Sequence, residues 1–150
     1  MKNLIFLSLL IASLNLCAQT NVDRNAKLSQ DKIEIWNKIE IQFESSKTYD
    51  NPIYEVQDFK IQFTAPSGRE KVVRGFWDGK TDWKVRFLHD ENGTWNWKST
   101  CSDQENNGLH NREGKFECIK NTNTNPIFQR GGIVHNPGSY YLSYNDGTPF

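Results

Sequence analysis

The segment TDWKVRFLHDENGTWNWKSTC, residues 81–101, holds two runs in which apolar and polar side chains alternate. In residues 83–87 and again in residues 95–97, aromatic or branched side chains alternate with lysine, arginine or asparagine. A period of two is typical of a β-strand with one buried and one solvated face. The polar residues 89–93 between the runs end in Asn-Gly, which is a turn signal. The segment therefore predicts an antiparallel hairpin.

One side of this segment carries a large aromatic load. A buried aromatic side chain removes about 150–250 Å² from water. At about 25 cal/mol per Å², each contributes on the order of 4–6 kcal/mol as an upper bound. A lone hairpin leaves that face in water, so we expect a second sheet over it and hence a β-sandwich. The predicted core residues are Trp83, Val85, Phe87, Trp95, Trp97 and Phe116.

The rest of the chain continues the strand pattern. Residues 33–43, 59–63 and 115–119 alternate in the same way, and no helical period follows the first 18 residues. The predicted sandwich covers residues 32–120. Trp36 has the wrong parity for the buried face, which indicates a bend where the chain changes sheet.

The amino terminus has the form of a secretion signal. Lys2 precedes an apolar run that is too short to span a membrane, and Leu16-Cys17-Ala18 resembles a cleavage site. We expect residues 1–18 to be a signal peptide, residues 19–31 to be a flexible mature terminus, and the protein to be secreted or periplasmic. A lipid anchor on Cys17 is the less favoured alternative. Lipoprotein signals have a small residue immediately before the acylated cysteine, and here that residue is Leu16.

Two cysteines, Cys101 and Cys118, remain after the signal. Both have inward parity, so a disulfide between them is one prediction, and its closed loop would contribute about 3 kcal/mol. Two buried free thiols are the alternative. Two cysteines without paired histidines do not make a metal site, and we expect no metal and no cofactor.

Charge and chemistry exclude several classes of function. The formal net charge is zero and the basic residues are scattered, so we expect no nucleic-acid partner. Glu34 and Glu40 would lie about 20 Å apart on a straight strand, too far for a glycosidase pair. The histidines share no ligand spacing and are predicted at the surface. No catalytic residue is assigned.

Four aromatic residues fall off the predicted core face or in loops, namely Trp36, Tyr49, Tyr54 and Trp77. They are candidates for a carbohydrate groove or for an interface with another domain, with ordinary packing as the alternative.

The last part of the chain differs in composition. Residues 121–126 are poor in apolar side chains and are predicted to be a linker. Residues 127–150 contain two short apolar runs and end in an Asp-Gly and Thr-Pro turn. Because such a turn normally leads into another strand, we expect this chain to be the amino-terminal piece of a longer protein.

Several short motifs occur together in a known order. They are Gly75-Phe-Trp-Asp-Gly79, Lys84-Val-Arg-Phe87, Gly93-Thr-Trp95, Ser102-Asp103, Gly108-Leu109, Gly114-Lys-Phe116 and Tyr144-Asn-Asp-Gly-Thr-Pro-Phe150. Together they resemble the Ig-like domain of unknown function, of the 5060 type, that precedes the catalytic barrel in apiosidase-like and related bacterial glycoside hydrolases.

This resemblance implies an all-β fold, an Ig-like or fibronectin-like antiparallel β-sandwich, followed by the first hairpin of a (β/α)₈ barrel at residues 127–150. It implies an accessory domain of a secreted enzyme acting on polysaccharide, with the downstream barrel as its partner. A free-standing carbohydrate-binding or adhesion module is the alternative from another class. A small enzyme is a third, which lacks a visible acid/base pair.

Overall fold

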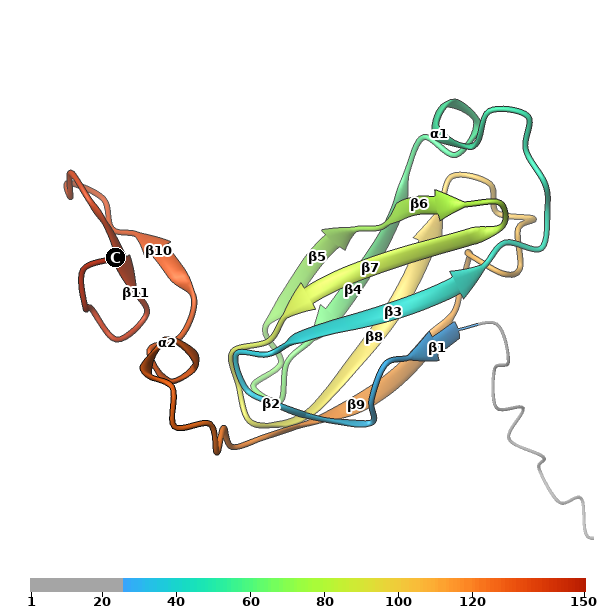
Figure 1. The fold of residues 1–150 in the computed structure, drawn as a ribbon. Coiled ribbons are helices and arrows are strands. Elements are labelled where there is room, and N and C mark those ends of the chain that lie inside the picture. Colours follow the sequence, from blue (N-terminus) through green and yellow to red (C-terminus); the bar gives the residue numbers. More distant parts are fainter. Residues whose placement is uncertain (1–25) are drawn as a thin grey trace, which may run out of the picture.

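The structure is a computed structural model that describes residues 26–150 (Figure 1). The predicted signal peptide, Cys17 and the first part of the predicted flexible terminus lie outside the described residues.

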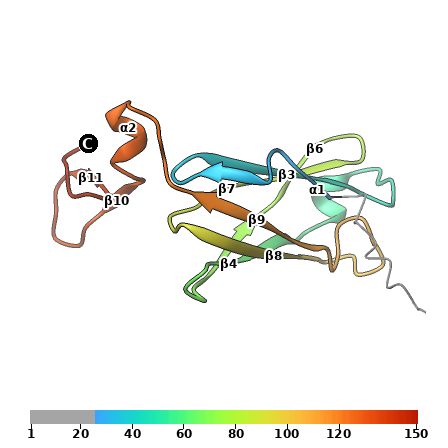
Figure 2. The ribbon, with the colours of Figure 1, turned by 90° about the horizontal axis from the view of Figure 1, so that it is seen from below.

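Two stacked sheets form a β-sandwich, as the alternation predicts, and Figure 2 shows the two layers edge-on. The four-stranded sheet has the order β1 (Ala26–Leu28), β3 (Lys38–Glu44), β7 (Asp82–Leu88), β6 (Phe76–Gly79). The five-stranded sheet has the order β2 (Lys32–Glu34), β9 (Glu113–Ile119), β8 (Gly93–Cys101), β4 (Phe59–Thr64), β5 (Glu70–Arg74). All neighbouring strands are antiparallel except β2 and β9, which are parallel.

The predicted hairpin between residues 83–87 and 95–97 is wrong. β7 pairs with β3 and β6, whereas β8 pairs with β4 and β9 in the other sheet. The connection crosses from one layer to the other, a distance of about 10 Å that four residues can span. Gly93 adopts a φ of 121° at the end of this crossing, so the Asn-Gly signal serves a change of layer and not a tight turn.

This crossing places the two aromatic runs face to face across the core. Phe87 meets Trp95 edge-on at a centroid distance of 5.2 Å and stacks on Phe63 at 4.2 Å. Phe43 contacts Trp97 in the same way at 5.5 Å. Such pairs add to the burial of the rings themselves. The six predicted core residues are all at most 6% exposed.

Trp36 marks the point where the chain changes sheet, as predicted. It lies between β2 in one sheet and β3 in the other, with a φ of 69°, a backbone conformation that is uncommon for a bulky residue. Its backbone N–H donates to the carbonyl of His89, 3.3 Å away. The β2–β3 connection at Trp36 and the β7–β8 connection at His89 are thus at the same end of the sandwich.

The sandwich begins earlier than we expected. Residues 26–28, predicted to belong to a flexible terminus, form β1 and pair with residues 41–43 of β3. The signal is weak in the sequence because a three-residue edge strand shows almost no period. In the five-stranded sheet, Val72 of the edge strand β5 is 61% exposed.

The predicted disulfide does not form, and both cysteines are buried free thiols. Cys118 on β9 lies opposite Gly93 at the start of β8, whereas Cys101 ends that strand. Eight strand residues separate the two positions by roughly 25 Å, far beyond the 4.4–6.8 Å that a disulfide allows between Cα atoms. Inward parity was right for both, but parity does not give position along the sheet.

Residues 126–144 form a small separate unit beyond the sandwich. It consists of the four-residue helix α2 (Pro126–Gln129) and an antiparallel pair, β10 (Ile133–His135) and β11 (Leu142–Tyr144). A second four-residue helix, α1 (Pro52–Glu55), lies at the other end of the sandwich (Figure 1). Neither helix is long enough to show a helical period in the sequence.

Candidate functional site

The four aromatic candidates do not form one site. Tyr49, Tyr54 and Trp77 lie near α1 and the β6–β7 turn, whereas Trp36 lies at the end that faces residues 126–144 (Figure 1). The sandwich therefore has two distinct aromatic ends, which we describe in turn.

Trp36 packs against the carboxyl-terminal unit. A Cβ placed on Gly131 would lie 3.1 Å from the Trp36 indole, and one on Gly132 would lie 3.7 Å from it. Asn121 bridges the same region, because its side-chain amide donates to the carbonyls of Ile35 and of Phe128 at 3.0 and 2.8 Å. These contacts join the sandwich to residues 126–144.

The opposite end contains an open cleft of ≈ 300 Å³ between α1 and β6. Its floor is apolar and aromatic, and its rim carries charged and amide side chains. We call it the α1 cleft, and its lining is Ile53, Val56, Gln57, Asp58, Phe59, Arg74, Gly75, Phe76, Trp77 and Trp83.

Trp77 lines the α1 cleft and is partly exposed. It is 37% exposed, and its indole Nε1 donates to the carbonyl of Lys80 at 2.9 Å. Lys80 has a φ of 50° in the tight turn that makes this bond possible. The bond restrains the ring, so little rotamer entropy remains to be lost when a ligand stacks on it. Ile53, 64% exposed, adds a second apolar group at the rim.

Two buried polar atoms in the cleft wall lack partners within residues 26–150. They are Oδ1 of Asp58, whose other oxygen pairs with Lys60 at 2.5 Å, and Nε1 of Trp83. A buried polar atom without a partner costs about 1–3 kcal/mol. One is an acceptor and the other a donor, so a hydroxyl group or a water molecule could pair with either.

Tyr49 is not available to a ligand in the way its sequence position suggests. Its hydroxyl donates to Asp103 at 2.8 Å and accepts from the amide of the buried Asn106 at 2.8 Å. Burial is the main reason why the pKa of Tyr49 is raised. The hydrogen bond from Lys47 is the main reason why the pKa of Asp103 is lowered. The Tyr49 hydroxyl is therefore already occupied by hydrogen bonds that link its loop to Asp103 and Asn106.

Tyr54 is the most exposed of the four aromatics. It is 75% exposed on α1 and lines a shallow polar hollow with Glu55, Gln57 and Asp103. Because Gln57 lines both this hollow and the α1 cleft, the two depressions adjoin.

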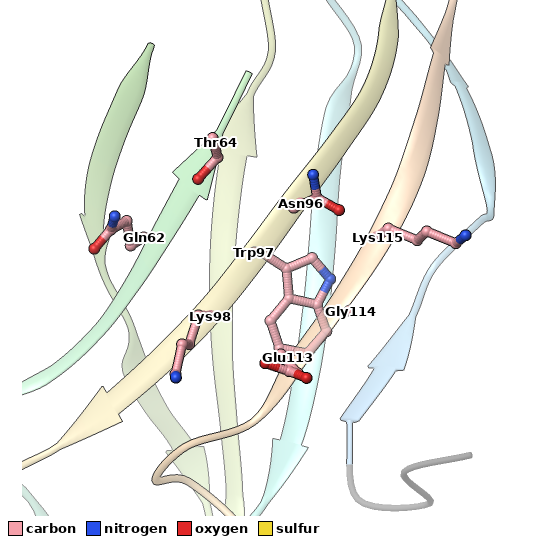
Figure 3. A pocket seen from close by; sticks show the side chains of 8 residues that line it. All are labelled: Gln62, Thr64, Asn96, Trp97, Lys98, Glu113, Gly114 and Lys115. Carbon is pink, nitrogen blue, oxygen red and sulfur yellow. The ribbon is translucent and has the colours of Figure 1, made fainter. Parts of the chain in front are cut away.

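A larger hollow of ≈ 590 Å³ lies over the five-stranded sheet (Figure 3). Figure 3 shows the Trp97 indole over the strand at Gly114, with Lys98 and Lys115 to either side. Gly114 makes room for this ring, because a Cβ there would lie 2.6 Å from it. Trp97 is only 3% exposed, however, so the hollow offers polar side chains and almost no aromatic face.

The two carboxylates considered from the sequence have structural roles. Glu40 accepts from Arg86 at 2.8 Å, and this hydrogen bond is the main reason why the pKa of Glu40 is lowered. Glu34 accepts from the hydroxyl and the backbone N–H of Thr122, at the start of the predicted linker. Within the described residues, no group of three or more potential ligands could hold a metal ion.

His89 was predicted at the surface, and this was wrong. Its side chain is fully buried against Phe116, with a ring distance of 5.4 Å. Burial is the main reason why its pKa is lowered, while the nearby backbone of Ile33 and Glu34 opposes the shift. Neither ring nitrogen reaches hydrogen-bond geometry with a described residue. The polar residues around it in the sequence concealed that it completes the inward parity of β7.

Part of the sandwich is similar to a known protein family. Residues 32–102 match a family described as Domain of unknown function (DUF5060). No curated protein matches the chain.

A crystal structure described as that of a "putative glycoside hydrolase from Bacteroides vulgatus ATCC 8482" is similar to this chain, with a TM-score of 0.62 and 25% identity. The similarity covers 81% of this chain and only 21% of that one. The chain therefore spans about a fifth of the length of that protein. The DUF5060 match and this likeness link the sandwich to glycoside hydrolases, as the motifs predict.

No helix among residues 26–150 is long and apolar enough to cross a membrane.

Proposed function

We propose that this chain is the Ig-like, non-catalytic accessory β-sandwich of a secreted bacterial glycoside hydrolase of the apiosidase-related type, and that it supports or orients a catalytic barrel that follows it. The observation that carries the proposal is the close approach of Gly131 and Gly132 to the Trp36 ring, which brings residues 126–144 against the end of the sandwich. The partial match to a much longer glycoside hydrolase chain supports the same reading.

The carboxyl-terminal unit has the surface expected of such a junction. Several of its large apolar side chains are exposed, and a following domain would cover them. They are Ile127, Ile133, Tyr140, Tyr141 and Leu142, each at least 43% exposed, and Phe150, just after the unit, is 65% exposed. A contact between domains of one chain usually buries several hundred to about 1,500 Å².

The partner in this proposal is the downstream barrel, and the substrate is a polysaccharide. The enzyme is secreted or periplasmic on the strength of its first 18 residues, with a lipid anchor at Cys17 as the less favoured form. A free-standing carbohydrate-binding or adhesion module is the second candidate, and the aromatic α1 cleft is the observation that favours it.

The test starts from the gene. We expect the reading frame to continue after Phe150 for several hundred codons and the longer protein to hydrolyse a polysaccharide. Trp36→Ala in that protein should loosen the junction and lower the melting temperature by a few degrees. Tyr54→Ala removes a 75% exposed aromatic ring on α1, at the other end of the sandwich, so it is the matched control and should not. A stop codon after Phe150 would overturn the proposal in favour of the second candidate.

A further inference from the structure

We propose that the α1 cleft is a binding site for one pyranose unit of a polysaccharide, with the Trp77 ring as its stacking surface. The inference rests on the proposed function for its class of ligand, because the sandwich is linked to glycoside hydrolases. Its geometry comes from this chain alone.

The shape of the cleft suits a single sugar ring. Its volume of ≈ 300 Å³ is at the lower end of the range for small-molecule sites, which is about 300–1,000 Å³. A pyranose has an apolar face of C–H groups and a rim of hydroxyls. The exposed ring of Trp77 and the side chain of Ile53 supply the apolar surface that such a face needs.

The polar groups of the cleft complement the hydroxyl rim. Asp58 Oδ1 is a buried acceptor and Trp83 Nε1 a buried donor, and both lack partners within the part of the chain that the structure describes. A sugar hydroxyl can donate and accept, so small movements on binding would let it pair with these atoms. At the rim, Gln57 and Arg74 are exposed, and neither side chain is engaged by another described residue.

The position of the cleft leaves it open when the junction is formed. Residues 126–144 lie at the Trp36 end of the sandwich, whereas the α1 cleft is next to α1 at the other end (Figure 1). The sandwich would thus hold an enzyme at one end and a polysaccharide chain at the other.

The experiment is affinity electrophoresis of residues 19–150 through gels that contain a panel of plant and algal polysaccharides. We expect at least one polysaccharide to retard the wild-type chain. Trp77→Ala and, separately, Ile53→Lys should each weaken that retardation about tenfold or more, as loss of a central contact does. Circular dichroism and melting establish that each variant is folded; because Ile53 is 64% exposed, its replacement should leave the fold intact even if Trp77→Ala does not.

Two matched controls make the result specific. Trp36→Ala removes an aromatic ring at the opposite end, and Lys98→Ala removes a side chain of the sheet hollow, so both should bind like wild type. Absence of retardation on the whole panel would overturn the inference, as would folded Trp77 and Ile53 variants that migrate like wild type. Retardation that Lys98→Ala abolishes would assign binding to the sheet hollow and also overturn it. The proposed function is tested by the reading frame after Phe150, and none of these binding outcomes affects that test.

Discussion

Cys101 and Cys118 face the same core from opposite ends of β8, roughly 25 Å apart. Burial raises the pKa of Cys118 to about 12 and also raises that of Cys101. Since the thiolate is the reactive form, both should be inert in the folded protein. In a chain that begins at Gln19, we expect Ellman's reagent to find two thiols after denaturation without reductant and almost none before it. A denatured, unreduced chain with no reactive thiol would contradict the register of β8 and β9.

Trp95 should be the most costly aromatic to remove. It is fully buried, stacks on Phe116 at 6.2 Å and donates through its Nε1 to the carbonyl of Glu91 at 2.9 Å. Trp95→Ala leaves a cavity in the middle of the sandwich and should cost about 3–5 kcal/mol. Urea unfolding measures this, with the exposed Tyr54→Ala as control, which should stay within about 0.5 kcal/mol of wild type. Equal midpoints for Trp95→Ala and wild type would refute the core assignment.

Buried His89 should make the protein sensitive to mild acid. The pKa of His89 in the folded protein lies below 6.5, its value in the unfolded chain. At a pH between the folded and the unfolded pKa, the unfolded chain binds the proton and the folded protein does not. Stability therefore decreases as the pH falls below about 6.5. Paired carboxylates such as Glu40, whose pKa is lowered, lose their contribution only below about pH 4.5, so the window from pH 7 to pH 5 isolates the histidine.

The measurement is the free energy of unfolding at pH 7 and pH 5. Wild type should lose stability over this range, and His89→Phe should lose clearly less. His135→Phe is the matched control, because that histidine is exposed on β10, and it should retain the wild-type decrease. A decrease that survives in His89→Phe would assign the effect to another group.

Gly131 should be essential to the junction, and the chain provides a matched control for it. Gly131 and Gly138 share a φ of 85°, so a side chain at either adds similar backbone strain. A Cβ at Gly131 would lie 2.7 Å from Asn145 Cβ and 3.1 Å from the Trp36 ring, whereas nothing lies within 4 Å at Gly138. Gly131→Ala should therefore release residues 126–144 from the sandwich, and Gly138→Ala should not.

Limited proteolysis in the 121–126 segment reports this release, because cleavage follows the population of the open form. We expect several-fold faster cleavage for Gly131→Ala than for Gly138→Ala. Equal rates would show that the Trp36 contact does not hold the unit in place.

The sequence predicted the fold well but not the pairing of its strands. Alternation shows which side chains face inward, so the burial of Trp83, Trp95 and Phe116 could be read directly. It does not show which strand lies beside which, and for that reason the hairpin and the disulfide were both predicted wrongly. Strand partners depend on contacts between residues far apart in the chain, which local period does not report.

The candidate site could be predicted only in part. Trp77 was predicted as an aromatic residue outside the core runs, but the α1 cleft also needs Ile53 and Asp58. These come from a four-residue helix and a loop about 20 residues away, and only the fold brings them together. Trp36 was found by its parity, while its partner Gly131 carries no side chain that a pattern could reveal.

The crossing at residues 89–92 has a consequence for how the domain comes apart. It connects β7, an inner strand of one sheet, directly to β8, the central strand of the other. Because this connection joins two inner strands, neither sheet can separate without displacing an inner strand of the other sheet. Partial unfolding should therefore be confined to edge strands such as β1 and β5. We expect one sharp, all-or-none unfolding transition for the sandwich, so its two ends should keep a constant distance and orientation until the whole domain unfolds.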